Sequence, residues 1–232
     1  MRAESPLRIC KLIRASLLLT AGGLLLVACE GSVEVSFAQP FPGQGADLAA
    51  FPARHRAVYT AADSISSLCV GRTAVWRQKR QSHVFGRHQL DSLHRRLTAD
   101  STYQEGGHLH YLRVMGQDSV RDSWLSCDTI FTLTGSGAGK LRRFQGRYYL
   151  NSPNESDGSW EVQRLEIKGN RMNWQTLGQD TLRLRALDTA SVHYYRARGV
   201  SHFHLAPATN QETRRVSRYD GLWETTGTYK RR

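Results

Sequence analysis

The sequence predicts an all-β fold, in which an antiparallel, duplicated meander forms a barrel or a sandwich and one short helix lies near residues 87–97. Two observations support this prediction. Short stretches rich in aromatic and branched residues recur about every ten residues, with Gly, Asn, Asp and Pro between them. In addition, one sequence motif occurs twice. The length allows one domain of about 200 residues or two of about 100, either with a sizeable core.

The expected strands share this aromatic and branched composition. They lie at 58–59, 68–70, 74–76, 109–114, 130–133, 147–150, 160–167, 172–177, 182–187, 192–195 and 203–205. Within 160–167, apolar and polar residues alternate, but the pattern slips between Val162 and Leu165. An extra residue in an antiparallel strand shifts alternation in this way, so we expect a β-bulge there.

The expected helix at 87–97 is indicated by Leu90, Leu93 and Leu97, which recur at helical spacing. Its one acidic residue comes early and two arginines come late, as the helix dipole favours. We expect this helix to cover an open barrel end or a sheet edge.

The internal repeat defines two approximate halves, residues 51–130 and 131–232. The segment G-Q-D-S-V-R at 116–121 returns as G-Q-D-T-L-R at 178–183, and F-T-L followed by R-R at 131–143 returns as F-H-L followed by R-R at 203–215. Gly116 and Gly178 fit hairpin turns, which favour glycine. The aspartates Asp118 and Asp180 fit as acceptors for turn amides.

A glycine followed two places later by an aromatic residue occurs after each arginine pair, at Gly146-Arg147-Tyr148 and Gly221-Leu222-Trp223. This pattern resembles the opening of lipocalin-type barrels. The resemblance covers only these residues, and it implies a barrel rather than a flat sheet.

The N-terminus contains a basic region followed by an apolar stretch at 15–28. Fourteen residues are too few to cross about 30 Å of hydrocarbon, so the stretch has the features of an export signal. It ends in Leu26-Val27-Ala28-Cys29, which resembles the lipobox of bacterial lipoproteins. The resemblance implies cleavage after residue 28, lipid on Cys29 and attachment to a membrane. The alternative is a plain secretory signal in which Cys29 is incidental.

The residue after Cys29 is Glu30 rather than the aspartate that retains enterobacterial lipoproteins in the inner membrane, so the resemblance favours the outer membrane. Residues 29–50 contain Pro40, Pro42, Gly43 and scattered apolar side chains, and we expect a flexible tether there. The folded β-domain is then expected at 51–232.

The chain is strongly basic, with a net charge of +12. The leader's four bases and one acid account for three of these charges, which leaves +9 for the mature chain. Arginine supplies most of the charge, and its planar guanidinium pairs well with phosphate and carboxylate. The arginine-rich surface could bind an anionic lipid or glycan, or it could simply be solvated. Nucleic acid is not expected as a partner outside the cytoplasm.

Two cysteines remain in the mature chain besides Cys29, at Cys69 and Cys127. An exported pair is free to oxidise, so they could form a disulfide. Neither belongs to a C-x-x-C motif or has the spacing of metal ligands, and a pair of free thiols is the alternative.

Two His-x-His pairs, His108 with His110 and His202 with His204, are the candidates for a metal site. Residues two apart on a strand share a face, so two adjacent strands could offer four imidazoles. However, the apolar neighbours of these histidines should take the inner face, which would leave all four histidines in solvent. We therefore expect no metal and no other cofactor.

No motif in the chain indicates an enzyme. The glycine-rich segment 134–141 lacks the spacing of a phosphate-binding loop, and no G-x-S-x-G nucleophile motif occurs. The sequence therefore favours a cell-envelope lipoprotein with a binding or structural role over an enzyme. The alternative is a hydrolase of envelope polymers built on the same β scaffold.

Overall fold

The computed structural model describes residues 32–92, 101–187, 192–219 and 221–232. In this part of the chain the strands form one 15-stranded sheet, so the all-β prediction is confirmed. The strands are β1 (Val33–Phe37), β2 (Asp47–Leu48), β3 (Ala57–Ala61), β4 (Ser66–Val70), β5 (Ala74–Gly86), β6 (Thr102–Glu105), β7 (His108–Val114), β8 (Ser119–Thr132), β9 (Lys140–Phe144), β10 (Arg147–Pro153), β11 (Trp160–Lys168), β12 (Arg171–Leu177), β13 (Val192–Ala197), β14 (Val200–Leu205) and β15 (Trp223–Arg231).

The sheet is continuous but does not close into a barrel. Its strands follow the order β13-β14-β1-β11-β12-β15-β3-β4-β5-β8-β7-β6, and β10, β9 and β2 branch from β11. All pairings are antiparallel except that of β1 with β14, whose five residue pairs run parallel from Val33↔Ser201 to Phe37↔Leu205.

The body of the molecule contains two hydrophobic cores that share the wall formed by β10 and β11. Tyr148 and Leu165 face the first core, which β3, β4, β12 and β15 complete. Tyr149 and Val162 face the second core, together with Phe37 of β1 and Phe203 of β14. Successive residues of a strand point to opposite faces, so neighbouring tyrosines serve different cores.

The shared wall corrects the expected bulge near 162–165. The pairing of β11 with β10 runs without a register shift from Trp160 to Glu166. Val162 and Leu165 point to opposite sides of the strand, and both sides are buried. The slip in the sequence pattern therefore marks a strand with two buried faces, not an inserted residue.

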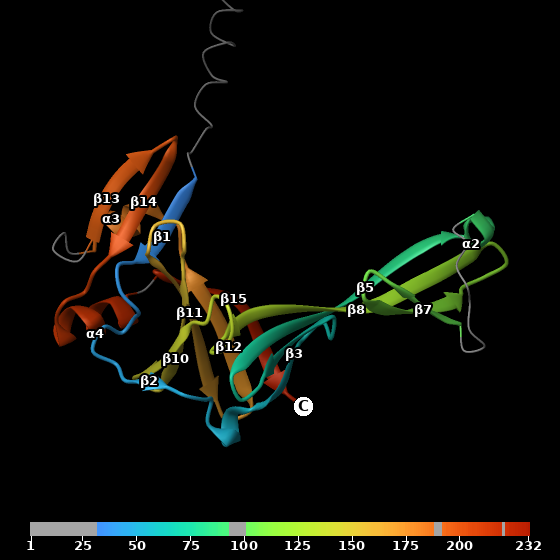
Figure 1. The fold of residues 1–232 in the computed structure, drawn as a ribbon, viewed down its shortest axis with the longest axis horizontal. Coiled ribbons are helices and arrows are strands. Elements are labelled where there is room, and N and C mark those ends of the chain that lie inside the picture. The colour runs from blue at the N-terminus through green and yellow to red at the C-terminus, as the bar shows by residue number, and fades with distance from the viewer. Residues whose placement is uncertain (1–31, 93–100, 188–191, 220) are drawn as a thin grey trace, which may run out of the picture.

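Long strands project from the body as an arm (Figure 1). β5 pairs with β8 along thirteen residues, Ala74 to Gly86, and β7 and β6 add to the outer half of β8. The helix α2 (His88–Ser92) lies at the tip of the arm and is the described part of the expected helix at 87–97, whose Leu93 and Leu97 lie outside the described residues.

Two further helices cover the second core, and one corrects a predicted strand. α3 (Thr181–Arg185) replaces the strand expected at 182–187, because the Asp180 carboxylate accepts hydrogen bonds from the Leu182 and Arg183 amides and so caps a helix. α4 (Asn210–Arg218) begins with a capping box formed by Thr209 and Glu212. A short 3-10 helix, η2, spans Ala53–His55.

The flexible tether expected at 29–50 is wrong for residues 33–50. β1 is an internal strand of the sheet, and both Phe37 and Phe41 are fully buried in the second core. The carbonyls of Pro40, Pro42 and Gly43 accept hydrogen bonds from the buried Arg142 guanidinium, which fixes the segment to β9. Cys29 lies outside the described residues, three positions before Ser32, where the description begins.

No helix in the described part of the chain is both long enough and apolar enough to span a membrane.

Candidate functional site

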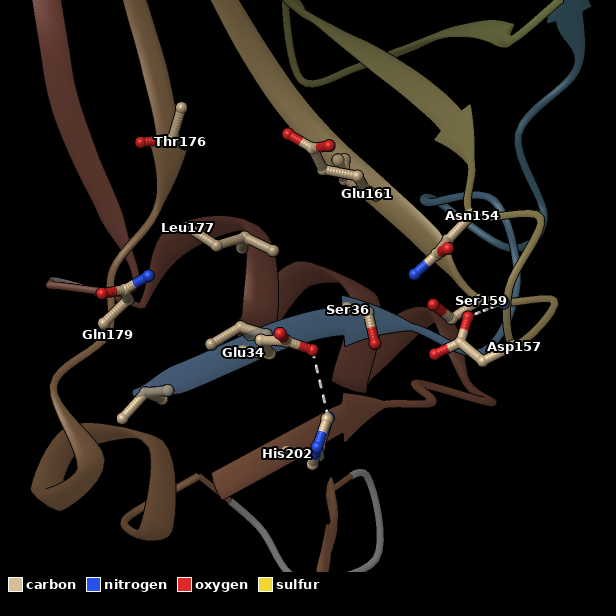
Figure 2. A pocket seen from close by; sticks show the side chains of 13 residues that line it. Glu34, Ser36, Asn154, Asp157, Ser159, Glu161, Thr176, Leu177, Gln179 and His202 are labelled. Carbon is tan, nitrogen blue, oxygen red and sulfur yellow. Dashed lines mark hydrogen bonds and ion pairs between the residues drawn. The ribbon is translucent and has the colours of Figure 1, made fainter. Parts of the chain in front are cut away.

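A cleft of the body lies where β1 separates from β11 (Figure 2). Its volume is about 350 Å³, within the range of small-ligand pockets. Most of its lining side chains are polar. Its residues are Val33, Glu34, Val35, Ser36, Asn154, Asp157, Ser159, Glu161, Val162, Thr176, Leu177, Gln179 and His202.

The cleft exists because β1 touches β11 at one end only. Phe37 pairs with Trp160, and the ladder between the two strands stops there. Buried Phe37 holds that end against the second core, while β14 pairs with the whole length of β1 and leads it away from β11. The turn before β11 and the end of β12 complete the walls.

The turn 154–159 places a carboxylate at the rim of the cleft. The Asn154 side chain accepts a hydrogen bond from the Ser156 amide at 3.1 Å, and Asp157 accepts one from the Ser159 amide at 2.9 Å. The Ser159 hydroxyl and amide lower the pKa of Asp157, with a smaller contribution from His204, and together they outweigh the opposing effect of burial. Asp157 is therefore a fixed anionic acceptor at neutral pH.

Ser159 itself is 4% exposed, and its hydroxyl oxygen makes no hydrogen bond of acceptable geometry with the described residues. The hydroxyl lies near enough to the Asp157 carboxylate to lower its pKa. A buried hydroxyl without a partner is unfavourable by about 1–3 kcal/mol. Because Ser159 lines the cleft, a polar ligand group could satisfy it.

The opposite wall carries Glu34, whose carboxylate lies 3.2 Å from Nδ1 of His202 (Figure 2). Next along the same face, the Ser36 hydroxyl lies 2.9 Å from Nδ1 of His204, and Nε2 of His204 lies 3.2 Å from the Tyr195 hydroxyl. The Tyr195 ring stacks on both imidazoles. These contacts fix the histidines of β14 beside the cleft.

The two predicted His-x-His pairs are far apart in the sheet, since β7 belongs to the arm and β14 to the opposite end. Within the described residues, no group of three or more His, Cys, Asp or Glu side chains is arranged to hold a metal ion. On β14, Phe203 and Leu205 are buried, while His202 and His204 lie on the opposite face of the strand and are half-buried beside the cleft.

For the other pair the expected orientation is wrong. His110 is buried, whereas Leu109 and Tyr111 are 41% and 53% exposed. His110 Nδ1 lies 3.0 Å from both oxygens of buried Asp122, which also accepts a 2.5 Å hydrogen bond from the Tyr103 hydroxyl. Tyr103, His110 and Asp122 thus form a buried polar network in the arm, where Phe85 and Val120 are also buried.

Of the two alternatives for the cysteines, the structure shows free thiols and no bridge. Cys69 and Cys127 are free thiols on β4 and β8, which flank β5 on opposite sides. Two strand spacings amount to about 9.5 Å, and a disulfide needs Cα atoms within about 7 Å. Burial, and to a smaller degree Cys127, raises the pKa of the Cys69 thiol.

The arginine pairs have different roles. Arg142 is buried and binds Asp47 at 2.6 Å, and Arg143 lies over the ring of Tyr148, so this pair stabilises the fold. Arg95 and Arg96 lie outside the described residues. A basic hollow of about 700 Å³ lies on the surface of α3 and α4, lined by Arg183, Arg214, Arg215, Arg218 and Tyr219.

Both predicted glycine turns are connections, but of different kinds. Gly116 joins β7 to β8 in a hairpin, as expected, and the Met115 amide donates to the Ser119 carbonyl at 2.9 Å. Gly178 instead precedes α3 and is packed against Gly221 and Glu224. The glycine-rich segment 134–141 joins β8 to β9.

Apart from His202, which was considered only as a metal ligand, the cleft residues were not identified from the sequence. Glu34 lies in the segment expected to be a tether, and Asp157 and Ser159 resemble ordinary turn residues. The one available signal was the alternation of 33–37, in which Val33, Val35 and Phe37 share a face.

Comparison of the chain with family models, with curated proteins and with solved structures finds no significant match.

Proposed function

We propose that this chain is a cell-envelope lipoprotein with a binding role, anchored by lipid on Cys29, and that the cleft beside β1 holds its ligand. The outer membrane is favoured over the inner by the residue after Cys29. The observation that carries the binding role is the cleft, because it combines fixed carboxylates, an unpartnered buried hydroxyl and unpaired strand edges.

The position of β1 supports a body held directly at the membrane. Only residues 30–32 separate Cys29 from Val33, and the four steps between these two residues span at most about 14 Å. Because β1 and β14 run parallel, the turn between β13 and β14 lies at this same end, with Arg196 and Arg198 exposed. Anionic lipid headgroups attract such side chains by about 1 kcal/mol each.

The basic hollow on α3 and α4 supports a second, anionic partner. Four arginines line it, and Arg183 is also paired with Asp180 at 3.2 Å. Arginine binds phosphate and carboxylate bidentately, so the hollow fits an anionic lipid or glycan. Nucleic acid is not proposed as a partner.

The anchor is tested by metabolic labelling with a fatty acid. We expect label on the wild type and its loss in Cys29→Ser, while Cys127→Ser, which changes an exposed thiol on the arm, keeps the label. Equal labelling of Cys29→Ser and wild type would show that Cys29 is not the attachment site.

The cleft is tested with the lipidated protein in detergent and three probes: a chitin oligosaccharide, a basic peptide and an acidic peptide. We expect at least one probe to bind in calorimetry, and Gln179→Trp, which obstructs the cleft rim, to weaken that binding at least tenfold. Gln104→Trp, at an exposed site on the arm, should leave it unchanged. Absence of binding by all three probes, or binding indifferent to Gln179→Trp, counts against the binding role.

A hydrolase of envelope polymers is the second candidate, and the contact between Ser36 and His204 favours it. The imidazole could take the serine proton, but its other nitrogen is oriented by the Tyr195 hydroxyl and not by a carboxylate. A fluorophosphonate probe distinguishes the candidates. A hydrolase that uses Ser36 is labelled by the probe, and Ser36→Ala removes the label. A binding protein carries no label at Ser36.

A further inference from the structure

The inner edge of β1 is unpaired over most of its length. Ser32 accepts a hydrogen bond from the Ser201 amide at 2.9 Å, and Ala38 donates one to the Leu205 carbonyl at 3.0 Å. The amide and carbonyl of one strand residue point to the same side, and successive residues alternate. Even-numbered residues of β1 therefore face β14, and Val33 and Val35 direct their backbone groups into the cleft.

The residues that line the cleft also show that strand edges border it. Residues 33–36 all line it, as do the neighbours Glu161 and Val162 and the neighbours Thr176 and Leu177. Side chains of consecutive strand residues point to opposite faces, so a run of consecutive residues lines a space only through the strand edge. The cleft is thus a gap within the sheet, bordered by the edges of β1 and β11 and by the end of β12.

The gap extends beyond the start of β1. A second hollow of about 840 Å³ shares Val33 and Gln179 with the cleft and continues past Ser32 toward Leu182. An elongated trough with unpaired backbone groups fits an extended chain better than a compact small molecule, because a strand of five or six residues is about 17–20 Å long.

The charged side chains of the cleft indicate which kind of extended chain could bind there. Three carboxylates, those of Glu34, Asp157 and Glu161, line it, although the chain as a whole has a net charge of +12. The Glu34 side chain is 65% exposed despite its contact with His202, so its carboxylate is open to a cationic group. The buried Ser159 hydroxyl provides a further polar contact.

We propose that an extended, basic peptide segment of another protein binds in this cleft as an added strand on the open edge of β1. The inference rests on the proposed binding function and names its ligand class. Backbone hydrogen bonds to Val33 and Val35 supply affinity, as in other cases of strand addition, and the three carboxylates select lysine or arginine side chains.

The test measures fluorescence anisotropy of a labelled eight-residue peptide of alternating Val and Lys with the lipidated protein in detergent. We expect saturable binding, at least tenfold weaker binding of the corresponding Val-Glu peptide, and at least tenfold weaker binding when alternate amides of the Val-Lys peptide are N-methylated. Two methylated peptides are made, one on the odd and one on the even residues, because only one of these sets of amides faces β1.

Variants separate a specific site from general attraction. Glu161→Gln, which retains the shape of an exposed side chain, should weaken binding about fivefold, and Asp118→Asn at the tip of the arm should not change it. Equal binding of methylated and unmethylated peptides, or equal effects of the two variants, overturns the inference.

The failure of this inference is distinguishable from failure of the binding function. If the Val-Lys peptide does not bind but the oligosaccharide binds in a manner that Gln179→Trp abolishes, the cleft remains a binding site and the peptide assignment is wrong. If the protein is a dimer in solution that Val35→Asp converts to a monomer, a second copy occupies the edge and the peptide assignment is again wrong.

Discussion

At the scale of single residues, equal sequence motifs take unequal roles because their surroundings differ. In the two copies of the repeat, Gly116 lies in an open hairpin and Gly178 lies against the backbone of Gly221. A Cβ atom at Gly116 would find its nearest neighbour, the Ser119 hydroxyl, at 3.8 Å. At Gly178 it would meet the Gly221 carbonyl oxygen at 2.7 Å, which is closer than atoms normally approach.

We therefore expect Gly178→Ala to lower the free energy of unfolding by about 1–3 kcal/mol, the usual range for overpacking. Gly116→Ala should change it by less than about 0.5 kcal/mol. Urea denaturation of both variants measures the difference. Equal stabilities would show that the contact between Gly178 and Gly221 does not limit the side chain.

Asp157 gives a prediction about pH. Its lowered pKa means that the ionised carboxylate stabilises the folded chain at pH values above the unfolded pKa of about 3.9, and that this contribution disappears as the pH falls through the lower, folded pKa. We expect Asp157→Asn to be less stable than wild type by a constant amount between pH 5 and 7, and the difference to shrink below about pH 4 and to vanish below the folded pKa. Denaturation at a series of pH values tests this, and a difference that persists at the acid end contradicts it.

At the scale of elements, strands rich in aromatic and branched residues were predictable, including the wall strands β10 and β11 with two buried faces, whereas β1 and α3 were not. The segments expected at 109–114, 147–150 and 172–177 match β7, β10 and β12 closely. α3 was missed because Leu182, Leu184 and Leu187 read equally well as a strand, and the cap from Asp180 decided the outcome. β1 was missed because prolines and glycines that follow it resemble a linker.

The candidate site was less predictable than the fold. Its carboxylates come from β1, a turn and β11, and only the splaying of β1 from β11 brings them together. That splaying depends on the parallel pairing of β1 with β14, which are about 170 residues apart in the sequence. Local patterns carry no information about a pairing of this range.

The arm gives a prediction at the element scale. Asp122 holds both Tyr103 and His110, and all three are less than 10% exposed. Asp122→Ala leaves two buried polar groups without this acceptor, which should weaken the arm locally by about 2–4 kcal/mol. Hydrogen exchange of the β7 amides should become much faster, while exchange in β11 stays unchanged.

The matched control is Asp128→Ala, also on β8, which removes an exposed ion pair with Arg77 of β5. Such a pair contributes at most about 1 kcal/mol, so exchange in β7 should remain near that of wild type. Slow β7 exchange in Asp122→Ala would show that the buried network does not hold the tip of the arm together.

At the scale of the whole molecule, lipid on Cys29, if attached as we propose, would place the end of the body that contains Val33 near the membrane. The β13–β14 turn starts beside Val33, while the tip of the arm lies at the far side of the molecule (Figure 1). The fold thus has a membrane-facing end and a remote end, provided that Cys29 carries lipid.

We test this arrangement with a fluorophore on a single introduced cysteine, in lipidated protein carrying Cys69→Ser and Cys127→Ser. A label at Ala197→Cys, in the exposed end of β13, should be quenched several-fold more by nitroxide-labelled lipid than a label at Gln117→Cys at the arm tip. Equal quenching at the two positions contradicts the proposed orientation.

The wall formed by β10 and β11 has a consequence for how the body unfolds. Tyr148 and Tyr149 are adjacent residues committed to different cores, so neither core can lose this wall without exposing the other. The two cores therefore melt as one cooperative unit, with a calorimetric enthalpy that matches the van't Hoff value for the whole body. The arm shares no such wall, and its melting is free to occur separately, at a temperature of its own.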